Sequence, residues 1–136
     1  MTPATVALTA AGIRFVAHTY AHDPGTTNYG LEAATALQLD PDRVFKTLLA
    51  DVDGRLTVGI VPVTGMLDLK ALAAAVGAKR AVMAEPAVAE RKTGYVVGGI
   101  SPIGQKTTLP TVVDETAVLW PTVFVSGGRR GFDLEL

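Results

Sequence analysis

The clearest structural signal in the sequence is the segment Val44-Phe45-Lys46-Thr47-Leu48-Leu49-Ala50-Asp51, which is followed by Asp53-Gly54 and by a second apolar run from Leu56 to Val61. An Asp-Gly pair between two apolar runs is typical of the tight turn that joins two antiparallel strands. Residues 44–51 and 56–61 therefore predict a β-hairpin. Because both faces of the first strand are largely apolar, we expect this strand to lie at the centre of a sheet.

Lys46 is the exception on this strand. Side chains of a strand point alternately to its two faces, so Lys46 shares an apolar face with Val44 and Leu48. An ammonium group in such a setting is costly unless it is paired, and lysines of this kind serve as electrostatic anchors or acid/base groups. The alternative is a lysine whose amine reaches water at the edge of the sheet. The strand pattern leaves both interpretations open.

The rest of the chain mixes strands and helices. Helices are expected from capping residues and alanine-rich runs at residues 2–12, 31–39, 68–77 and 85–92, with one further helical turn after Asp40. Further strands are expected at residues 14–20, 80–83, 111–114, 122–126 and 132–136. Strict strand–helix alternation is missing, which predicts an α+β fold: a mixed, largely antiparallel sheet curled into a partial barrel with helices packed outside. We expect residues 1–136 to form a single domain.

Composition excludes several classes of protein. The chain has 136 residues, of which 49% are hydrophobic and 18% charged, whereas a disordered chain is poorer in apolar residues. It contains no cysteine, which removes a disulfide framework, a thiolate metal site and a cysteine nucleophile. The net charge of −1 offers no broad basic field, so we expect no DNA partner. Without a visible signal peptide or a membrane-length apolar run, we expect a soluble, cytoplasmic protein with no membrane partner.

Two histidines have a spacing that suggests a metal site. His18 and His22 are four residues apart, as in a helical metal pair, but they lie on or just beyond a predicted strand. Four strand residues span ~13 Å, which is too far for one ion to bridge. We therefore predict no metal site and no cofactor.

A glycine-rich segment at residues 94–104 is a candidate ligand-binding loop. It differs from a Walker A phosphate loop because Gln105 interrupts the required Gly-Lys-Thr order. The adjacent glycines Gly98 and Gly99 allow backbone amides to come close to a ligand, and such amides can stabilise an oxyanion or bind a sugar hydroxyl. The alternative is an ordinary tight turn.

A second glycine-rich segment, Ser126-Gly127-Gly128-Arg129-Arg130-Gly131, is predicted as a turn that carries two arginines. Between residues 79 and 130 basic side chains outnumber acidic ones, so this half of the chain offers a local anion-binding face. Guanidinium groups beside exposed amides suit phosphate, which makes Arg129 and Arg130 candidates for phosphate contacts. Solvated arginines on a surface hairpin are the alternative.

Longer blocks of the sequence resemble the YbaK family of aminoacyl-tRNA deacylases, and within it most closely the members that act on Cys-tRNA(Pro). The blocks follow the family's order along nearly the whole chain. They are His18–Pro24, Thr27–Gly30, Asp40–Pro41, Val44–Leu49, Thr93–Pro102, Gly104–Lys106, Leu109–Thr111, Val125–Gly131 and Asp133–Leu136.

The resemblance implies the family's fold and a metal-independent editing enzyme without a cofactor. The expected partners are the aminoacylated 3′ end of tRNA and prolyl-tRNA synthetase. Lys46 matches the family's essential lysine and is the implied catalytic residue. The segment Gly98-Gly99-Ile100-Ser101-Pro102 matches the backbone-amide loop at the terminal adenosine and the scissile ester. Further implied positions of the substrate pocket are Tyr20, Tyr29, Thr47, Ser126 and Asp133.

The implied chemistry is substrate-assisted cleavage of the ester in mischarged Cys-tRNA(Pro). The thiol of the substrate attacks its own ester carbonyl, and a well-oriented internal nucleophile has an effective concentration of ~10⁵ M or more. An Ala-tRNA(Pro) deacylase of the same family, which uses water, stays open as an alternative. So do a non-catalytic module that binds a nucleotide or the tRNA 3′ end, and a structural partner of prolyl-tRNA synthetase. Family members commonly continue into a C-terminal helix, whereas this sequence stops at Leu136.

Overall fold

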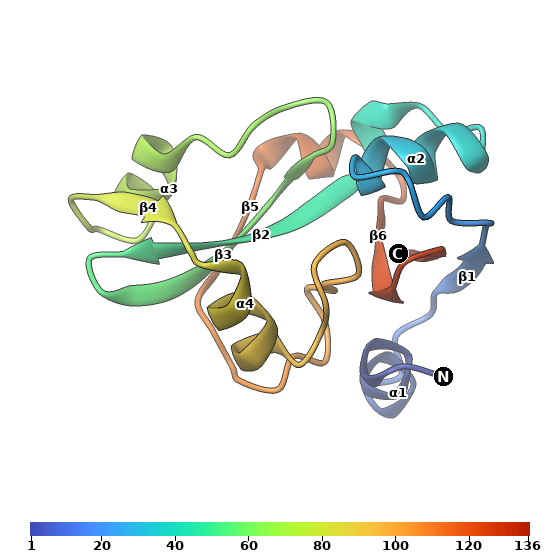
Figure 1. Cartoon of the computed structure of the whole chain (residues 1–136), viewed down its shortest axis with the longest axis horizontal. Coiled ribbons are helices and arrows are strands. Elements are labelled where there is room, and N and C mark those ends of the chain that lie inside the picture. Colours follow the sequence, from blue (N-terminus) through green and yellow to red (C-terminus); the bar gives the residue numbers. More distant parts are fainter.

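The strands of the protein form two sheets (Figure 1). The computed structural model describes residues 1–136 and contains the strands β1 (Val16–Thr19), β2 (Phe45–Val52), β3 (Arg55–Pro62), β4 (Ala81–Met83), β5 (Thr111–Val113), β6 (Phe124–Arg129) and β7 (Phe132–Glu135). The four-stranded sheet has the order β4-β2-β3-β5, and the three-stranded sheet has the order β1-β7-β6. Only the β3–β5 pair in these sheets is parallel. The predicted α+β class with largely antiparallel strands is confirmed.

The central hairpin also agrees with the prediction. β2 and β3 pair antiparallel from Phe45 opposite Pro62 to Val52 opposite Arg55. Both turn residues are left-handed, with φ of 50° at Asp53 and 85° at Gly54, the backbone conformation that a tight hairpin turn requires. β4 pairs with the outer side of β2 and β5 with the outer side of β3, so the hairpin lies at the centre of its sheet.

Backbone pairing between the two sheets is limited to one bridge. A single parallel bridge joins Val44, just before β2, to Phe124 at the start of β6. Apolar side chains from both sheets, including Phe45, Val125 and Leu134, share one buried cluster. The continuous curled sheet of a partial barrel is not confirmed, because hydrogen bonding across the junction is limited to that bridge. Sequence periodicity indicates which residues form strands but not which strands pair.

The helices flank the sheets. They are α1 (Pro3–Ala10), α2 (Tyr29–Ala36), α3 (Leu69–Ala75) and α4 (Pro86–Thr93), with the short 3₁₀ helices η1 (Pro41–Arg43) and η2 (Glu115–Leu119). In Figure 1, α3 lies with β4 at the turn end of the β2–β3 hairpin, and α2 lies at the opposite end, near β1. No helix is long and apolar enough to span a bilayer.

Local capping signals explain where most of these helices begin. Thr2 caps α1 within a capping box, Asp40 caps η1, and Asp68 caps α3, as predicted. α2 begins two residues earlier than predicted because the Asn28 side chain accepts a hydrogen bond from the Leu31 N–H. η2 was not predicted.

The predicted turn at residues 126–131 is wrong for most of its length. β6 continues through Ser126 to Arg129, and a β-bulge between these two residues absorbs the glycines. The turn itself is confined to Arg130 and Gly131. A glycine pair therefore marks an irregular strand here rather than the end of one.

Candidate active site

A cavity of about 600 Å³ lies among α2, β2, α4, the glycine loop that follows α4, and the strands β6 and β7. It brings together residues that are far apart in the sequence. Of the predicted site residues, those that line it are Tyr20, Tyr29, Lys46, Thr47, Gly98, Ile100, Ser126 and Asp133.

Three residues of the predicted glycine loop lie behind the cavity wall instead. A Cβ atom on Gly99 would come within 2.7 Å of the Arg129 Cα, so this glycine permits the loop to pack on β6. Ser101 is fully buried. Pro102 lines a second, apolar cavity of about 270 Å³. The loop therefore separates the two cavities, and it presents Gly98 and Ile100 to the larger one.

Lys46 lies in the cavity wall on β2, with its Cα opposite Val61 of β3. The side chain is partly buried, and its amine forms neither a hydrogen bond nor an ion pair with the rest of the protein. Three N–H donors unused by the protein thus lie beside the cavity, a placement that is compatible with both interpretations that the strand pattern left open. Such an amine is available to an anionic or carbonyl ligand.

The neighbouring Thr47 has an unused polar group of its own. Its hydroxyl oxygen is buried and has no hydrogen-bond partner, and the residue lines the same cavity. A buried hydroxyl without a partner costs about 1–3 kcal/mol. Because the hydroxyl oxygen has almost no accessible surface, it is an unpaired polar group inside the wall rather than a contact point of the cavity.

Asp133 places a carboxyl group on the opposite wall. It lies on β7, with Ser126 of β6 as its cross-strand neighbour, and is only 5% exposed. Burial raises the pKa of Asp133 to about 7. Burial, and next the negative charge of Asp133, raise the pKa of Tyr20 to about 12. Near neutral pH the site thus holds a neutral phenol beside a carboxyl group that is close to its titration midpoint.

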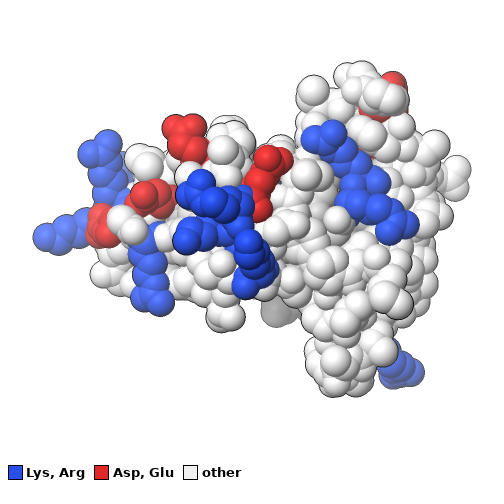
Figure 2. All heavy atoms as spheres, turned by 60° about the horizontal axis from the view of Figure 1, so that its bottom comes forward, with Lys and Arg blue, Asp and Glu red and all other residues white.

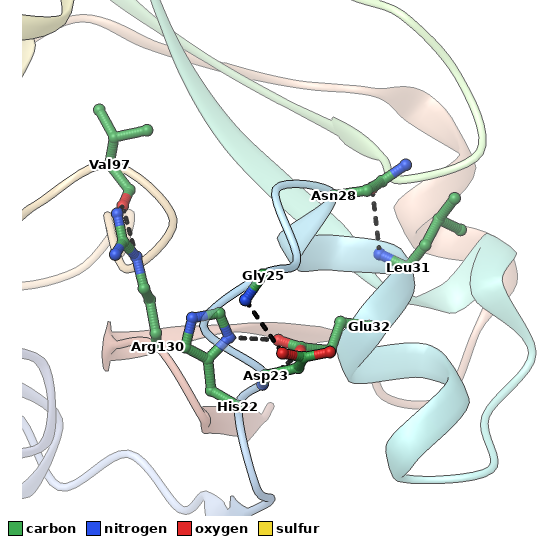
Figure 3. Close-up of polar contacts among 8 residues, drawn as sticks. All are labelled: His22, Asp23, Gly25, Asn28, Leu31, Glu32, Val97 and Arg130. Carbon is green, nitrogen blue, oxygen red and sulfur yellow. Dashed lines mark hydrogen bonds and ion pairs between the residues drawn. The ribbon is translucent and has the colours of Figure 1, made fainter.

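A hydrogen-bond cluster anchors the segment that carries Tyr29 into the cavity (Figure 3). His22 Nδ1 and Glu32 Oε1 are 2.6 Å apart, and the other Glu32 oxygen accepts the Asp23 N–H at 2.8 Å. Burial acts to raise the pKa of Glu32, but the hydrogen bonds of His22 and Asp23 outweigh it and lower that pKa. These contacts hold residues 22–28 against α2.

The two histidines that were considered as a metal pair each contact a glutamate. His22 pairs with Glu32, while His18 Nε2 lies 3.0 Å from the Glu135 Oε1. The structure contains no group of three or more His, Cys, Asp or Glu side chains that could hold a metal ion. The spacing of these histidines therefore reflects packing contacts on different elements.

Neither arginine that was predicted to contact phosphate lines the cavity. The Arg130 guanidinium donates two hydrogen bonds to the Val97 carbonyl and lies 4.7 Å from the centre of the Tyr29 ring. The Arg129 guanidinium lies 4.2 Å from the centre of the Phe132 ring. On the face that Figure 2 draws, Lys and Arg side chains form separate groups, some with Asp or Glu beside them, rather than one continuous basic surface.

Sequence reasoning missed an apolar wall of the cavity. This wall comes from the end of β4 and from α4, through Met83, Ala84, Pro86 and Ala89. No local signal distinguishes these residues from ordinary core residues, because their place in the wall depends on how α4 packs beside β2. Thr27, Asn28 and Gly30 also line the cavity, and the resemblance contained them without giving them a role.

Fold and cavity together define a small α+β protein with a cavity walled by a lysine, a buried carboxyl group and a glycine loop. Residues 24–136 match the family of the aminoacyl-tRNA editing domain. The chain belongs to this family.

Two relatives match a large part of the chain. One, from Enterococcus faecalis, is provisionally named Cys-tRNA(Pro)/Cys-tRNA(Cys) deacylase EbsC; it is 41% identical over 106 residues, which are 76% of this chain and 63% of that protein. The other, a proline–tRNA ligase from Moorella thermoacetica, is 33% identical over 103 residues, which are 76% of this chain and 18% of the ligase. The matched part is thus less than two thirds of either relative.

The fold is also known from crystal structures. One, of a proposed trans-editing enzyme for prolyl-tRNA synthetase, superposes with a TM-score of 0.85 at 25% identity. The match covers 98% of this chain and 83% of the other. It extends the agreement over α1 and β1, which precede the family match.

Proposed function

We propose that this protein is a hydrolase that deacylates mischarged aminoacyl-tRNA in trans, with Cys-tRNA(Pro) as its substrate. The observation that carries the proposal is the single cavity that Lys46, Gly98 and Asp133 all line. Its volume of about 600 Å³ suits a ligand of nucleoside size, such as the aminoacylated terminal adenosine of a tRNA. Family membership and the names of the relatives support the same activity.

Each side of the cavity has a task in this proposal. Lys46 holds the tRNA end or the ester by charge and hydrogen bonding, because its three donors have no protein partner. The carboxylate of Asp133 binds the α-ammonium group of the substrate, which has the complementary charge. The apolar wall formed by β4 and α4 receives the small side chain of the amino acid.

The chain has no cysteine, and no hydroxyl that lines the cavity forms a hydrogen bond with a lysine, histidine or carboxyl side chain. No histidine lines the cavity, and the Ser126 hydroxyl accepts a hydrogen bond from the Gly128 N–H. We therefore propose that the nucleophile comes from the substrate. The cysteine sulfur bonds to its own ester carbonyl carbon, the bond from that carbon to the ribose oxygen breaks, and the thiol proton passes to the ribose oxygen. The products are a cysteine thiolactone and deacylated tRNA.

The same comparisons support the proposed substrate and partner. tRNA is the expected ligand of an editing domain, and prolyl-tRNA synthetase is the proposed partner that supplies the mischarged tRNA. Because tRNA charging takes place in the cytoplasm, we propose that the protein acts there. On the face that Figure 2 draws, the basic side chains form separate groups, which fits few phosphate contacts on that face.

The absence of a hydrogen-bonded nucleophile and base also supports a second candidate, a module that binds the tRNA 3′ end without cleaving it. In that case Lys46 and Gly98 hold the terminal adenosine, and no amino acid is released. An Ala-tRNA(Pro) deacylase that uses water is the third candidate. The three differ in which ester they cleave, so one assay separates them.

The test compares tRNA(Pro) charged with cysteine, S-methylcysteine, alanine or serine. We expect fast release from the cysteine ester only, with an early product one water lighter than cysteine. Lys46→Ala is expected to lower this rate by at least ~10-fold, the loss of one charged contact. The matched control, Lys70→Ala, removes an exposed lysine of α3 and leaves the rate unchanged.

The other outcomes contradict the proposal in different ways. Equal turnover of all four esters, or full activity of Lys46→Ala, would refute it. Selective turnover of the alanine ester would establish the Ala-tRNA(Pro) deacylase instead. Saturable binding of charged tRNA without any release would establish the binding module.

A further inference from the structure

The glycine loop contains a β-turn whose central peptide unit faces the cavity. The Gly99 N–H donates to the Val96 carbonyl at 2.8 Å, and Gly98, the third residue of the turn, has a φ of 89°. A bond from the first to the fourth residue together with a positive φ at the third defines a type II turn. The central peptide unit consists of the Val97 carbonyl and the Gly98 N–H.

Arg130 holds one side of this peptide unit (Figure 3). Its Nε and Nη2 atoms both donate to the Val97 carbonyl oxygen, at 3.0 and 2.7 Å. The Tyr29 ring lies against the guanidinium, at 4.7 Å from the ring centre, and the Val97 N–H donates to Glu90 Oε2 at 2.8 Å. Hydrogen bonds therefore hold both the Val96–Val97 peptide, through the Val97 N–H, and the Val97 carbonyl.

The other side of the unit is unoccupied. No peptide bond in the chain is cis, and in a trans peptide the C=O and N–H groups point in opposite directions. The Gly98 N–H therefore points away from Arg130. It has no hydrogen-bond acceptor in the protein, and Gly98 lines the cavity. A donor that is fixed in direction and has no acceptor is suited to a negative oxygen of a bound ligand.

We propose that Arg130 is a positioning residue. Its two hydrogen bonds to the Val97 carbonyl keep the turn in its type II form. In this form the Gly98 N–H faces the ester oxygen that becomes negative during the reaction. This inference rests on the proposed deacylase function. In a type I turn the central peptide is reversed, which would direct the Val97 carbonyl, rather than an N–H, towards the cavity. A carbonyl there repels a developing oxyanion.

Two features make an arginine necessary at this position. Its planar guanidinium donates two converging hydrogen bonds to one oxygen and stacks on an aromatic ring, whereas a lysine provides a single point charge. Glycine is necessary at position 98 as well, because a Cβ atom there would lie 2.8 Å from both the Arg130 Nε and the Tyr29 ring. The turn, the arginine and the ring thus form one assembly.

The test uses Arg130→Met and Arg130→Lys, with Arg55→Met as the matched control. Arg55 is also an exposed arginine, but it lies at the turn end of the β2–β3 hairpin. We expect kcat for Cys-tRNA(Pro) to fall by ~10–100-fold in Arg130→Met, approaching the loss of one oxyanion donor, while KM changes by less than about 3-fold. Arg130→Lys should restore only a small part of kcat, and Arg55→Met should leave both constants unchanged.

A second measurement needs no substrate. The ψ angle of the second turn residue is about +120° in type II and about −30° in type I, so the Val97 α-proton and the Gly98 amide proton are close only in type II. We expect a strong nuclear Overhauser effect between them in the wild type and in Arg55→Met, and a much weaker one in Arg130→Met. Spectra that retain the dispersion of the wild type show that the variant is folded.

The two readouts separate this inference from the proposed function. If the wild type cleaves no aminoacyl ester, the proposed function fails, and the Overhauser effect still decides whether Arg130 holds the turn. An unchanged Overhauser effect in Arg130→Met overturns the inference, whatever the activity. So does an active wild type whose Arg130→Met variant loses the type II signal but keeps its kcat.

Discussion

Tyr20 and Asp133 share the cavity wall, and their ionisation states are linked: burial first, and then the negative charge of Asp133, raise the pKa of Tyr20 to about 12. The two residues lie more than a hundred positions apart in the sequence and on neighbouring elements, since β7 pairs with β1 and the Tyr20 N–H donates to the Gly131 carbonyl at 3.0 Å. Because burial also raises the pKa of Asp133 to about 7, this carboxyl group changes its charge in the physiological range.

Deacylation is expected to depend on the charge of Asp133. The proposed contact with the substrate ammonium needs the carboxylate, which predominates above a pKa of about 7, so kcat/KM for Cys-tRNA(Pro) rises as the pH passes through 7. Asp133→Asn should remove this inflection and lower kcat/KM by ~10–100-fold at pH 8, with a smaller loss at pH 6. The measurement is a pH profile from pH 5.5 to 8.5, corrected for spontaneous ester hydrolysis. An inflection that persists in Asp133→Asn would assign it to another group.

The free energy of unfolding should also depend on the charge of Asp133, but it should fall, rather than rise, as the pH increases. The pKa of about 7 in the folded state lies above the ~3.9 of an exposed aspartate, so the folded state favours the protonated carboxyl group. Its contribution is fully present below about pH 4 and is lost as the pH rises through 7. Asp133→Asn, which stays neutral, should therefore stabilise the free protein by on the order of 4 kcal/mol at pH 8 but by only about 1.5 kcal/mol at pH 5. Urea unfolding at both pH values measures the difference; equal effects at pH 5 and pH 8 would contradict it.

The features that agree with the sequence prediction are those determined by short-range interactions. The Asp53-Gly54 turn and the caps at Thr2, Asp40 and Asp68 depend on residues within a few positions of each other. η2 has a signal of the same kind, since the Asp114 side chain accepts hydrogen bonds from the N–H and hydroxyl of Thr116, at 2.9 and 2.7 Å. This helix could therefore have been predicted.

The candidate site was only partly predictable, because it depends on contacts between distant segments. The strand pattern alone indicated Lys46, because this residue is a lysine within an apolar strand. Tyr20, Asp133 and Ser126 came from the family resemblance, since nothing in their local sequence indicates that β7 lies between β1 and β6. The division into two sheets and the hydrogen bonds of Arg130 to the Val97 carbonyl likewise depend on contacts between residues far apart in the sequence.

The unpaired hydroxyl of Thr47 gives a test of the site through stability. Thr47→Val replaces a buried group without a partner by an apolar group of similar shape, so it should leave the free energy of unfolding unchanged or raise it by up to about 1.5 kcal/mol. The matched control is Thr57→Val on β3, because the hydroxyl of that buried threonine donates to the Arg55 carbonyl at 3.2 Å. It should destabilise the protein by about 0.5–1.5 kcal/mol. Equal destabilisation by both substitutions would mean that Thr47 has a partner in solution.

The contact between His22 and Glu32 should make the stability of the cavity wall depend on pH. Hydrogen bonds lower the pKa of Glu32 below its usual value, so its stabilising contribution is present at neutral pH and is lost as the pH falls through that lowered pKa. Glu32→Gln keeps the size of the side chain but removes its charge. We expect it to lower Tm at pH 7, with a difference from the wild type that shrinks as the pH falls towards 3.

Amide exchange of residues 22–28 should accelerate in the variant at pH 7, because Glu32 holds both His22 and the Asp23 N–H. Glu115→Gln, at an exposed position of η2, serves as the control and should change neither quantity. A Tm difference for Glu32→Gln that is the same at pH 3 and pH 7 would show that the charge of Glu32 contributes nothing to the stability of this wall.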